Sequence, residues 1–530
     1  MSKLERVPGT QLPPLLRVAR QINAQSDLAP LSRTVLEEAL ALARAEAGVL
    51  WLRREEQHQE WLECARQALD GEEEGADPGP DQPRLPLDDA HAGHPAVRTV
   101  RGGEALHLTA PALDDEDRAR LVPGLVTRVV SLLLVPLTNH EGRVVGVLQL
   151  VNARGEQGAG PFPARTRALL EALGGYAGIA LNNLMLVREL KDLLDAFVKV
   201  FARAIDAKSS HTSAHCERVP LLTELLARAA CEDGGEFADF QLDEDEWYEL
   251  RVAAWLHDCG KLAIPDSVLD KATKLHGLHD RIELVAARFS AARSEVERRY
   301  LRDCLEDPDR EPEHRLRWQT DIDALEADLT FLERINIGGE TMAAEDEARV
   351  RRIAERPWVD ARGETRPLLS DDEVSNLCIT RGTLTEEERR IINSHMDVTL
   401  DMLESLPFPR KLRRVPEYAG GHHERMDGTG FPRGLTREQM SIPARIMAIA
   451  DVFEALTARE RPYKTPLKIS EALGIMQRMR DNRHLDPDLY RLFLDAGGWR
   501  AYANAALLFA PPFHWQAHTD SSTGTRIRTR

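Results

Sequence analysis

The chain has 530 residues, of which 42% are hydrophobic and 29% are charged, and its formal net charge is −18. This length suffices for two or three domains with their own cores, and the acidic balance argues against binding to nucleic-acid duplexes or anionic membranes. Six cysteines without a C-x-x-C pair are typical of a reducing cytosol. The N-terminus shows no signal-peptide pattern, and the most apolar stretches are shorter than the ~20 residues of a membrane span. We therefore expect a cytoplasmic protein.

Residues 1–28 form a short amphipathic lead, and residues 29–187 mix helical and strand patterns. In this second region, VVSLLLVPLTNHEGRVVGVLQLVN contains two β-branched runs joined by the turn residues 139–142, which predicts a buried hairpin. The hairpin and the following FPARTRALLEALGGYAGIALNN resemble a GAF domain, a small α/β (α+β) sensor module. Such domains bind cyclic nucleotides, haem, tetrapyrroles or nothing, and the residues do not choose among these ligands.

A long amphipathic helix is predicted next, with residues 188–204 as the connection to a second domain. Its apolar residues recur every three or four positions: Leu181, Leu184, Val187, Leu190, Leu194, Phe197 and Phe201. This spacing suits a parallel coiled coil and hence a homodimer. The alternative is a helix packed on its own domain.

Residues 205–500 are helical in pattern and predict an all-α domain, followed by a C-terminal tail, 501–530, whose end is expected to be disordered. Within this domain, residues 272–382, approximately, are charge-rich and contain few candidate ligands, so we interpret them as an insertion. RFSAARSEVERRYLRDCLED and DIDALEADLTFLERIN are expected to form an antiparallel helical pair in it.

The stretch LHDCGKLAIPD places a histidine and an aspartate side by side at the end of an apolar helix. Leu250, Ala253 and Ala254 share a helical face with His257, and Asp258 follows directly. A buried His–Asp pair is costly unless it is paired or ligates a metal. A single histidine on an apolar face is nevertheless more often an ordinary core residue.

The same pattern recurs on three other predicted helices. His215 shares a face with Val219, and Asp451 lies on a small-residue face of PARIMAIADVFEALTA. His395 lies in TEEERRIINSHMDVTLDML, which opens with a capping box at 385–388. Several ligand types on separate buried faces favour one shared metal centre over chance.

A histidine pair, His422 and His423, lies in YAGGHHERMDGTGFPRG. Neighbours in a regular helix point roughly 100° apart, so both can face one site only at a helix end or between two metals. The following Asp427–Pro432 run is typical of a turn. The alternative is a solvated loop in which the pair occurs by chance.

These motifs resemble the HD superfamily of metal-dependent phosphohydrolases, and specifically its HD-GYP branch, over about 205–275 and 383–490. The matching residues are His215, His257, Asp258, Gly260, Lys261, His395, His422, His423, Glu424, Asp427, Gly428, Gly430, Phe431, Pro432 and Asp451. The resemblance implies an HD-type helical bundle that hydrolyses cyclic di-GMP to the linear dinucleotide pGpG, to GMP, or to both. It also implies a two-metal centre of iron or manganese type.

Two positions depart from the family pattern. The tyrosine of the family's Gly-Tyr-Pro is Phe431, which keeps the ring and is expected to affect the metals little. A carboxylate that supports a third metal in some members is His211, so a third metal is less expected, with His211 as its candidate ligand.

The expected chemistry explains the ligand types. Two cations about 3.5–4 Å apart lower the pKa of a bridging water and clamp a phosphate. Asp258 is the natural bridge, because a carboxylate can offer one oxygen to each cation. Five imidazoles favour iron, manganese, zinc or nickel over magnesium, and the resemblance favours the first two.

Roles outside the ligand set are also expected. Lys261 is expected to approach a phosphate oxygen, although a solvated lysine at a helix end is the alternative. By resemblance, Arg461 and Lys464 contact substrate phosphate; the alternative is a plain surface loop. Glu424, with Asp427 nearby, is expected to orient a histidine ring.

The leading hypothesis is a GAF-regulated cyclic-dinucleotide phosphodiesterase. One alternative is a receptor that binds cyclic di-GMP without hydrolysing it. Another keeps the metal chemistry but acts on a different nucleotide.

Overall fold

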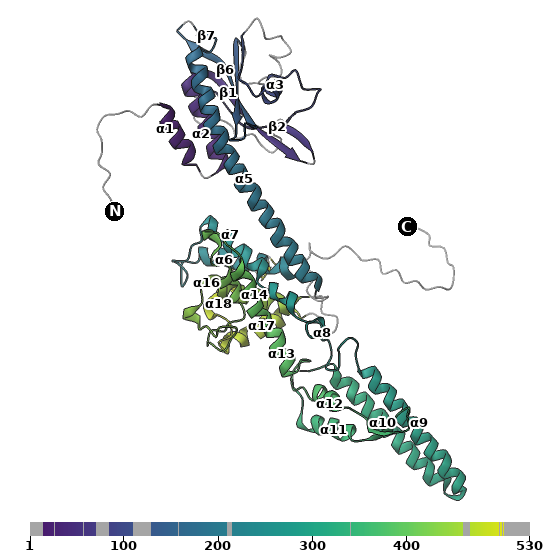
Figure 1. Cartoon of the computed structure of the whole chain (residues 1–530). Helices are drawn as coiled ribbons and strands as arrows, with labels where there is room; N and C mark the ends of the chain where they lie inside the picture. The colour runs from purple at the N-terminus through teal and green to yellow at the C-terminus, as the bar shows by residue number, and fades with distance from the viewer. Residues whose placement is uncertain are drawn as a thin grey trace, which may run out of the picture. The chain divides into compact units, whose positions relative to one another are not determined.

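The computed structural model describes residues 14–25, 27–56, 58–69, 84–109, 129–156, 158–208, 215–339, 341–458, 467–497, 499–500 and 502. The chain divides into two compact units, Met1–Leu194 and Asp195–Arg530. The first contains a β-sheet with helices, and the second is helical (Figure 1). This is the predicted fold class, an α/β sensor-type domain followed by an all-α domain.

Unit 1 is built on one antiparallel sheet with the strand order β3-β2-β1-β6-β5-β4, and β7 pairs with β6. The strands are β1 (Ala45–Glu56), β2 (Gln59–Leu69), β3 (Arg84–Pro86), β4 (Leu106–Thr109), β5 (Ser131–Thr138), β6 (Val144–Gly155) and β7 (Gly158–Gly160). The predicted hairpin is confirmed as β5 and β6, with Leu132 opposite Val151. Asn139 closes its turn by accepting from the backbone N–H of Arg143 at 2.9 Å.

Both faces of this sheet are covered by apolar side chains. One face packs with α1 (Pro14–Asn23), α2 (Leu28–Ala43) and the first half of α5 (Ala164–Lys208). The other face has its own apolar cluster, to which α3 (Pro95–Gly102) contributes Ala96. Gly178 allows α5 to approach the sheet closely, because a Cβ there would lie 2.4 Å from the carbonyl oxygen of Thr138. Burial on both faces explains why the hairpin strands are almost continuously apolar.

Helix α5 is 45 residues long and includes the whole predicted connecting helix. Leu170, Leu173, Ala177 and Leu181 on one side belong to the core of unit 1. Among the described helices, α5 has the length and apolar composition that would suit a membrane span. Part of that apolar surface is therefore already used inside a domain core.

Unit 2 is a bundle in which α6 packs against α7 and α16, and α15 packs against α7, α14 and α16. Its helices are α6 (His215–Glu232), α7 (Glu244–Leu256), α8 (Asp266–Leu269), α13 (Glu386–Asn393), α14 (His395–Ser405), α15 (Val415–Gly420), α16 (Ile442–Thr457), α17 (Ile469–Asp481) and α18 (Pro487–Asp495). The predicted capping box at Thr385 and Glu388 is present. The helix that it opens ends at Asn393, and a new helix starts at His395, where the sequence suggested a single helix.

The segment expected as an insertion has a hydrophobic cluster of its own, whose members lie between Leu275 and Cys378. Its elements are α9 (Ile282–Glu306), α10 (Glu311–Asn336), α11 (Ala344–Ala354), β8 (Pro357–Val359), β9 (Thr365–Pro367) and α12 (Asp371–Leu377). Helices α9 and α10 lie side by side as the expected pair (Figure 1). At the base of this segment, the ammonium of Lys271 is buried between Asn376 (2.8 Å) and Glu388 (2.7 Å).

A buried carboxylate ties three parts of unit 2 together. Asp486 is 1% exposed; it pairs with Arg437 at 2.8 Å and Arg445 at 2.6 Å, and caps α18 through the N–H of Leu489. Burial alone would raise the pKa of Asp486, but the two guanidinium groups and the backbone hydrogen bond hold it below its usual value. Asp486 therefore stabilises the fold in its ionised form.

We predict that Asp486→Asn lowers the free energy of unfolding of unit 2 by about 2 kcal/mol at pH 7. Asparagine keeps the cap, so the loss reports the two ion pairs. Because the folded pKa is depressed, the stabilisation is complete above the unfolded pKa of about 3.9 and is lost as the pH falls through the folded pKa. Urea unfolding at pH 7 and near pH 3, which is below the unfolded pKa, measures both effects. The exposed Asp495→Asn is the control, and equal stability of the two variants at pH 7 contradicts the prediction.

Candidate metal centre

The predicted ligands come from separate segments of unit 2, and nearly all of them lie at the ends of helices. His215 is the first residue of α6, His257 and Asp258 follow α7, and His395 is the first residue of α14. His422 and His423 follow α15, and Asp451 lies within α16. All are at most 9% exposed except His423, which is partly exposed. The sequence placed His257 on a helical face, but the helix ends one residue before it.

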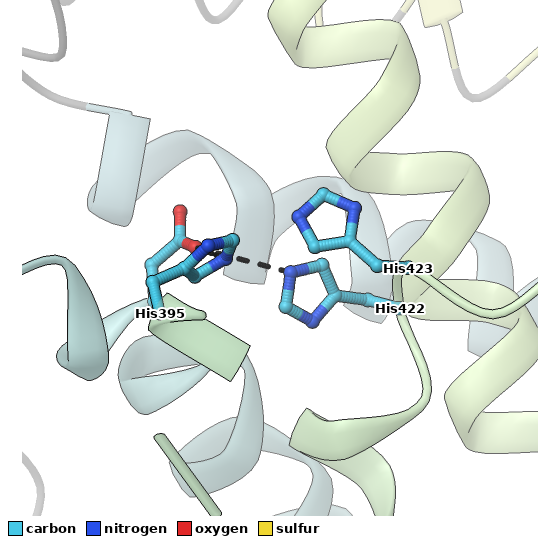
Figure 2. Close-up of side chains that lie close together, drawn as sticks. His395, His422 and His423 are labelled. Carbon is cyan, nitrogen blue, oxygen red and sulfur yellow. Dashed lines mark ion pairs between the residues drawn. The ribbon is translucent and has the colours of Figure 1, made fainter. Parts of the chain in front are cut away.

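The structure brings these side chains into two adjacent groups that share Asp258. One contains Asp258, His395, His422 and His423, and the other contains His215, His257, Asp258 and Asp451. Within each group, the candidate ligand atoms lie within 4.8 Å of one another. Figure 2 shows the three histidines of the first group with their rings gathered around one point.

The two oxygens of Asp258 face different groups. Oδ1 lies 3.4 Å from Nε2 of His395 and 3.9 Å from Nε2 of His422. Oδ2 lies 3.4 Å from Nε2 of His215 and 3.2 Å from Nε2 of His257. Asp451 Oδ1 completes the second group at 3.5 Å from Nε2 of His215. A carboxylate so placed can offer one oxygen to each of two cations.

Three of the histidine rings are held in orientation by a contact between Nδ1 and a backbone carbonyl. Nδ1 of His257 faces the carbonyl of Ala254 at 2.9 Å, as Nδ1 of His395 faces Ile392 and Nδ1 of His422 faces Ala419, both at 2.6 Å. A carbonyl only accepts, so each Nδ1 carries a proton, and in the neutral ring Nε2 then keeps its lone pair. This is the arrangement in which a histidine binds metal through Nε2.

The same atoms lack any other partner. Nε2 of His215, His257, His395 and His422, and Oδ1 of Asp258, are buried without a hydrogen bond. Leaving such groups unsatisfied is costly, and buried polar groups without partners are rare in folded proteins. Divalent cations would satisfy all of them at once. The residues therefore fit a pair of metal ions, and their imidazole-rich character excludes a magnesium-type, all-oxygen shell.

Charge in the pocket is closely balanced. Burial alone would raise the pKa of Asp258, but Lys261 and His257 hold it well below its usual value. Burial, together with neighbouring rings, depresses the pKa of His422, and burial lowers that of His423 to about 4. Burial also opposes a charge on His215, yet the Glu454 and Asp258 carboxylates raise its pKa to about 10. Cations bound there would replace such protons, so metal binding is expected to release protons.

Glu454 is a site residue that the sequence analysis missed. It is 1% exposed, contacts Nδ1 of His215, and accepts from Nε of Arg218 at 2.7 Å. It lies one helical turn beyond Asp451 on α16, so both carboxylates face the same neighbour, α6. The i,i+3 spacing of two acidic residues in an apolar helix was the available signal.

Other expected residues have different surroundings from those anticipated. Both carboxylate oxygens of Glu424 accept from the backbone, from Arg433 N at 2.7 Å and Leu435 N at 2.9 Å. Glu424 thus holds the loop after the histidine pair, whereas we had expected it to orient a ring. Asp427 is exposed and accepts from the N–H and hydroxyl of Thr429, which lowers its pKa. His211, Arg461 and Lys464 lie outside the described residues.

We predict that His257→Ala and His395→Ala each lower the bound metal of the purified full chain from two ions to one or none. Each variant removes one of the four candidate ligands from only one of the two groups, which weakens binding of that ion and leaves the ligands of the other intact. Elemental analysis after anaerobic purification measures the metal content. The exposed His279→Ala is the control and should keep the content of the unmodified protein. Unchanged metal in both ligand variants would exclude this centre.

Family models match a part of each unit. A GAF domain family model matches residues 25–182, and an HD domain family model matches residues 371–489, which include His395, the His422–His423 pair and Asp451. A Vibrio cholerae protein named 3'3'-cGAMP-specific phosphodiesterase 3 is 25% identical over 299 residues, 56% of this chain and 38% of that protein. A protein of Pseudomonas aeruginosa named cyclic di-GMP phosphodiesterase is 39% identical over 117 residues, 22% of this chain and 27% of its own length.

The chain therefore spans less than half the length of these curated relatives. Among solved structures, unit 1 is similar to the GAF domain of an Acinetobacter phosphoenolpyruvate-protein phosphotransferase. That match has a TM-score of 0.26 and 17% sequence identity, and covers 33% of this chain and 93% of the other.

Proposed function

We propose that this chain hydrolyses a phosphodiester bond of a cyclic dinucleotide. The reaction would take place at the candidate metal centre, where Asp258 belongs to both ligand groups. In the chain, a GAF domain is followed by an HD domain. The observation that carries the proposal is the pair of ligand groups joined by the two oxygens of one buried carboxylate. Relatives named as cyclic-dinucleotide phosphodiesterases support the substrate class. We take the GAF module as 29–187 and the phosphodiesterase domain as 205–500.

The residues divide the chemical work between them. Two divalent cations, iron or manganese by preference and zinc or nickel otherwise, would lower the pKa of water and polarise the phosphate. His215, His257 and Asp451 would hold one cation, and Asp258 would touch both. Fixed Nδ1 contacts keep His215 and His257 in place, so little reorganisation accompanies the reaction.

Lys261 supplies the positive charge nearest to the bridging carboxylate. Its ammonium lies 2.5 Å from Oδ2 of Asp258 and its side chain is 21% exposed, so one end of the pair remains open to solvent. From this position the ammonium can donate to a non-bridging phosphate oxygen as negative charge develops there. By resemblance, Arg461 and Lys464 would contact substrate phosphate.

Cyclic di-GMP is our preferred substrate, with pGpG, GMP or both as products. The names of the relatives divide between cyclic di-GMP and 3'3'-cGAMP, so the substrate assay must include both. A ligand of the GAF domain would regulate the turnover. All six cysteines are free, which agrees with a cytoplasmic location.

We predict that the full chain, loaded anaerobically with manganese or iron, converts cyclic di-GMP to a linear product. We also predict that Lys261→Met lowers kcat by about tenfold or more while keeping two metal ions, because it removes charge stabilisation but no ligand. Product analysis by chromatography, with 3'3'-cGAMP and cyclic di-AMP in parallel, measures turnover and substrate choice.

The exposed Lys411→Met is the control for the loss of a lysine. Stoichiometric binding of cyclic di-GMP without product would favour the receptor alternative. Turnover confined to another nucleotide would keep the metal chemistry and change the substrate.

We also propose a homodimer through α5. Its exposed apolar side chains are Leu169, Tyr176, Ile179, Leu186, Val187, Leu190, Leu193, Phe197, Val200 and Phe201. From Tyr176 to Val200, all of them except Val187 fall at alternating steps of three and four residues once position 183 is included, the spacing of a two-stranded coiled-coil seam. This seam differs from the one predicted from the sequence, whose Leu181 lies in the core of unit 1. The exposed Asn183 occupies one seam position, where a polar residue fixes register and the number of strands.

We predict that the unmodified chain sediments as a dimer at micromolar concentration and that the double variant Leu190→Asp, Leu193→Asp sediments as a monomer. Two carboxylates facing their copies across an apolar seam would lose burial and repel each other. Analytical ultracentrifugation measures the mass. Lys199→Asp, on the same helix but off the seam, should remain a dimer. A monomeric unmodified chain contradicts the proposal.

A further inference from the structure

The last two turns of α5 contact the segments that carry the metal centre. Oδ1 of Asp206 accepts from the backbone N–H of Cys216, the residue after His215, at 3.4 Å. Nζ of Lys208 donates to the carbonyl oxygen of Leu262, the residue after Lys261, at 2.6 Å. One helix end thus holds both the start of α6 and the short 3₁₀ helix Cys259–Ala263.

A third contact from α5 reaches the helix that precedes His257. The carboxylate of Asp195 accepts from the hydroxyl of Tyr248 on α7 at 2.8 Å. Between these polar contacts, Val198, Ala202 and Ile205 are buried at steps of three or four residues. The part of α5 from Asp195 onward therefore belongs to unit 2, with one face packed and polar groups in contact with the segments that carry the ligands.

The two terminal contacts differ from ordinary surface pairs in being partly shielded from water. Lys208 is 24% exposed and its ammonium bonds to a carbonyl, which makes the bond charge-assisted. Burial raises the pKa of the Asp206 carboxyl, so that side chain is partly removed from water where it meets α6. By contrast, Arg203 of α5 lies 3.9 Å from Glu217 of α6, and its side chain is 75% exposed.

The contacted segments have little freedom of their own. Cys216 is fully buried and follows the ligand His215 directly. The 3₁₀ helix contains Gly260, whose N–H donates to Oγ1 of Thr399 at 2.9 Å, and it begins directly after Asp258. A displacement of Leu262 or Cys216 must therefore reach Asp258, Lys261 or His215, because packed segments transmit small shifts rather than absorb them.

We propose that Asp206 and Lys208 are positioning residues through which the end of α5 sets the geometry of the metal centre. Asp206 places His215, and Lys208 places the turn that bears Asp258 and Lys261. The regulatory part of this proposal rests on the proposed function. A movement at the end of α5 would change the geometry of the metal centre without contacting a ligand, and would thereby change the activity.

The first test uses Lys208→Met in the full chain, with Lys208→Arg as the rescue variant and Arg203→Met as the matched control. Hydrogen–deuterium exchange in metal-free protein reports the turn directly, through the amides of Lys261 and Ile264, which donate to Asp258 O (2.9 Å) and Lys261 O (3.1 Å). We expect these amides to exchange about tenfold faster in Lys208→Met and at the unmodified rate in the other two variants. Equal exchange in Lys208→Met and Arg203→Met overturns the role of Lys208.

The second test compares Asp206→Ala with Asp206→Asn. The asparagine keeps an oxygen that accepts from Cys216 N, whereas alanine removes it. We expect the Kd for Mn²⁺ to rise about tenfold in Asp206→Ala and to stay within about twofold in Asp206→Asn. A purely structural role would instead lower the melting temperature in Asp206→Ala with unchanged Mn²⁺ affinity, and that result overturns the proposal for Asp206.

A third test measures turnover, if the unmodified chain hydrolyses a cyclic dinucleotide. Lys208→Met should lower kcat by about tenfold with KM within about twofold, because the turn carries Lys261 and Asp258. If the unmodified chain hydrolyses no cyclic dinucleotide, the proposed function fails. The exchange and Mn²⁺ measurements still decide whether Asp206 and Lys208 position the centre.

Discussion

The organisation of unit 2 depends on one buried carboxylate. Asp258 is 1% exposed and lies among the Nε2 atoms of four histidines, with one ammonium beside it. An ionised carboxylate at such a position is costly unless positive charge surrounds it, and once that charge is present the interaction is strong. The backbone is shaped to reach this arrangement: a Cβ at Gly260 would lie 2.0 Å from the carbonyl oxygen of His395, so only glycine lets the two ligand segments meet.

Around this centre, further carboxylates hold the ligand segments in place. Glu454 joins α16 to His215 and Arg218, and Glu424 closes the loop that follows the histidine pair. Asp486 ties the same region to α18 through Arg437 and Arg445. Each is at most 1% exposed and each is fully engaged. The ligands come from many segments, so their positions depend on the contacts that these carboxylates make. This explains why acidic residues are buried in this region.

Local periodicity predicted much of this arrangement, because the ligands interrupt otherwise apolar faces. It found His215, His395 and Asp451, the β5–β6 hairpin and the capping box at Thr385. It failed where the answer depended on tertiary partners. The break at Ser394 and the end of α7 before His257 place those histidines at helix ends, where an i−3 carbonyl can fix Nδ1. Glu424 was assigned to a ring because it adjoins one in sequence, whereas its partners lie nine and eleven residues on. Side-chain direction at a helix end is not encoded in a 3.6-residue pattern.

The same geometry limits what the centre can discriminate. Its ligands and Lys261 are suited to a phosphodiester and its surrounding charge, a feature that all cyclic dinucleotides share. The names of the relatives specify different cyclic dinucleotides, which agrees with the phosphate-directed centre that we propose. Selection between guanine and adenine requires hydrogen bonds to base edges, and the candidate ligands, which are largely buried and lie close to one another, are not placed to supply them. On the proposed function, base recognition therefore falls to segments outside the ligand set.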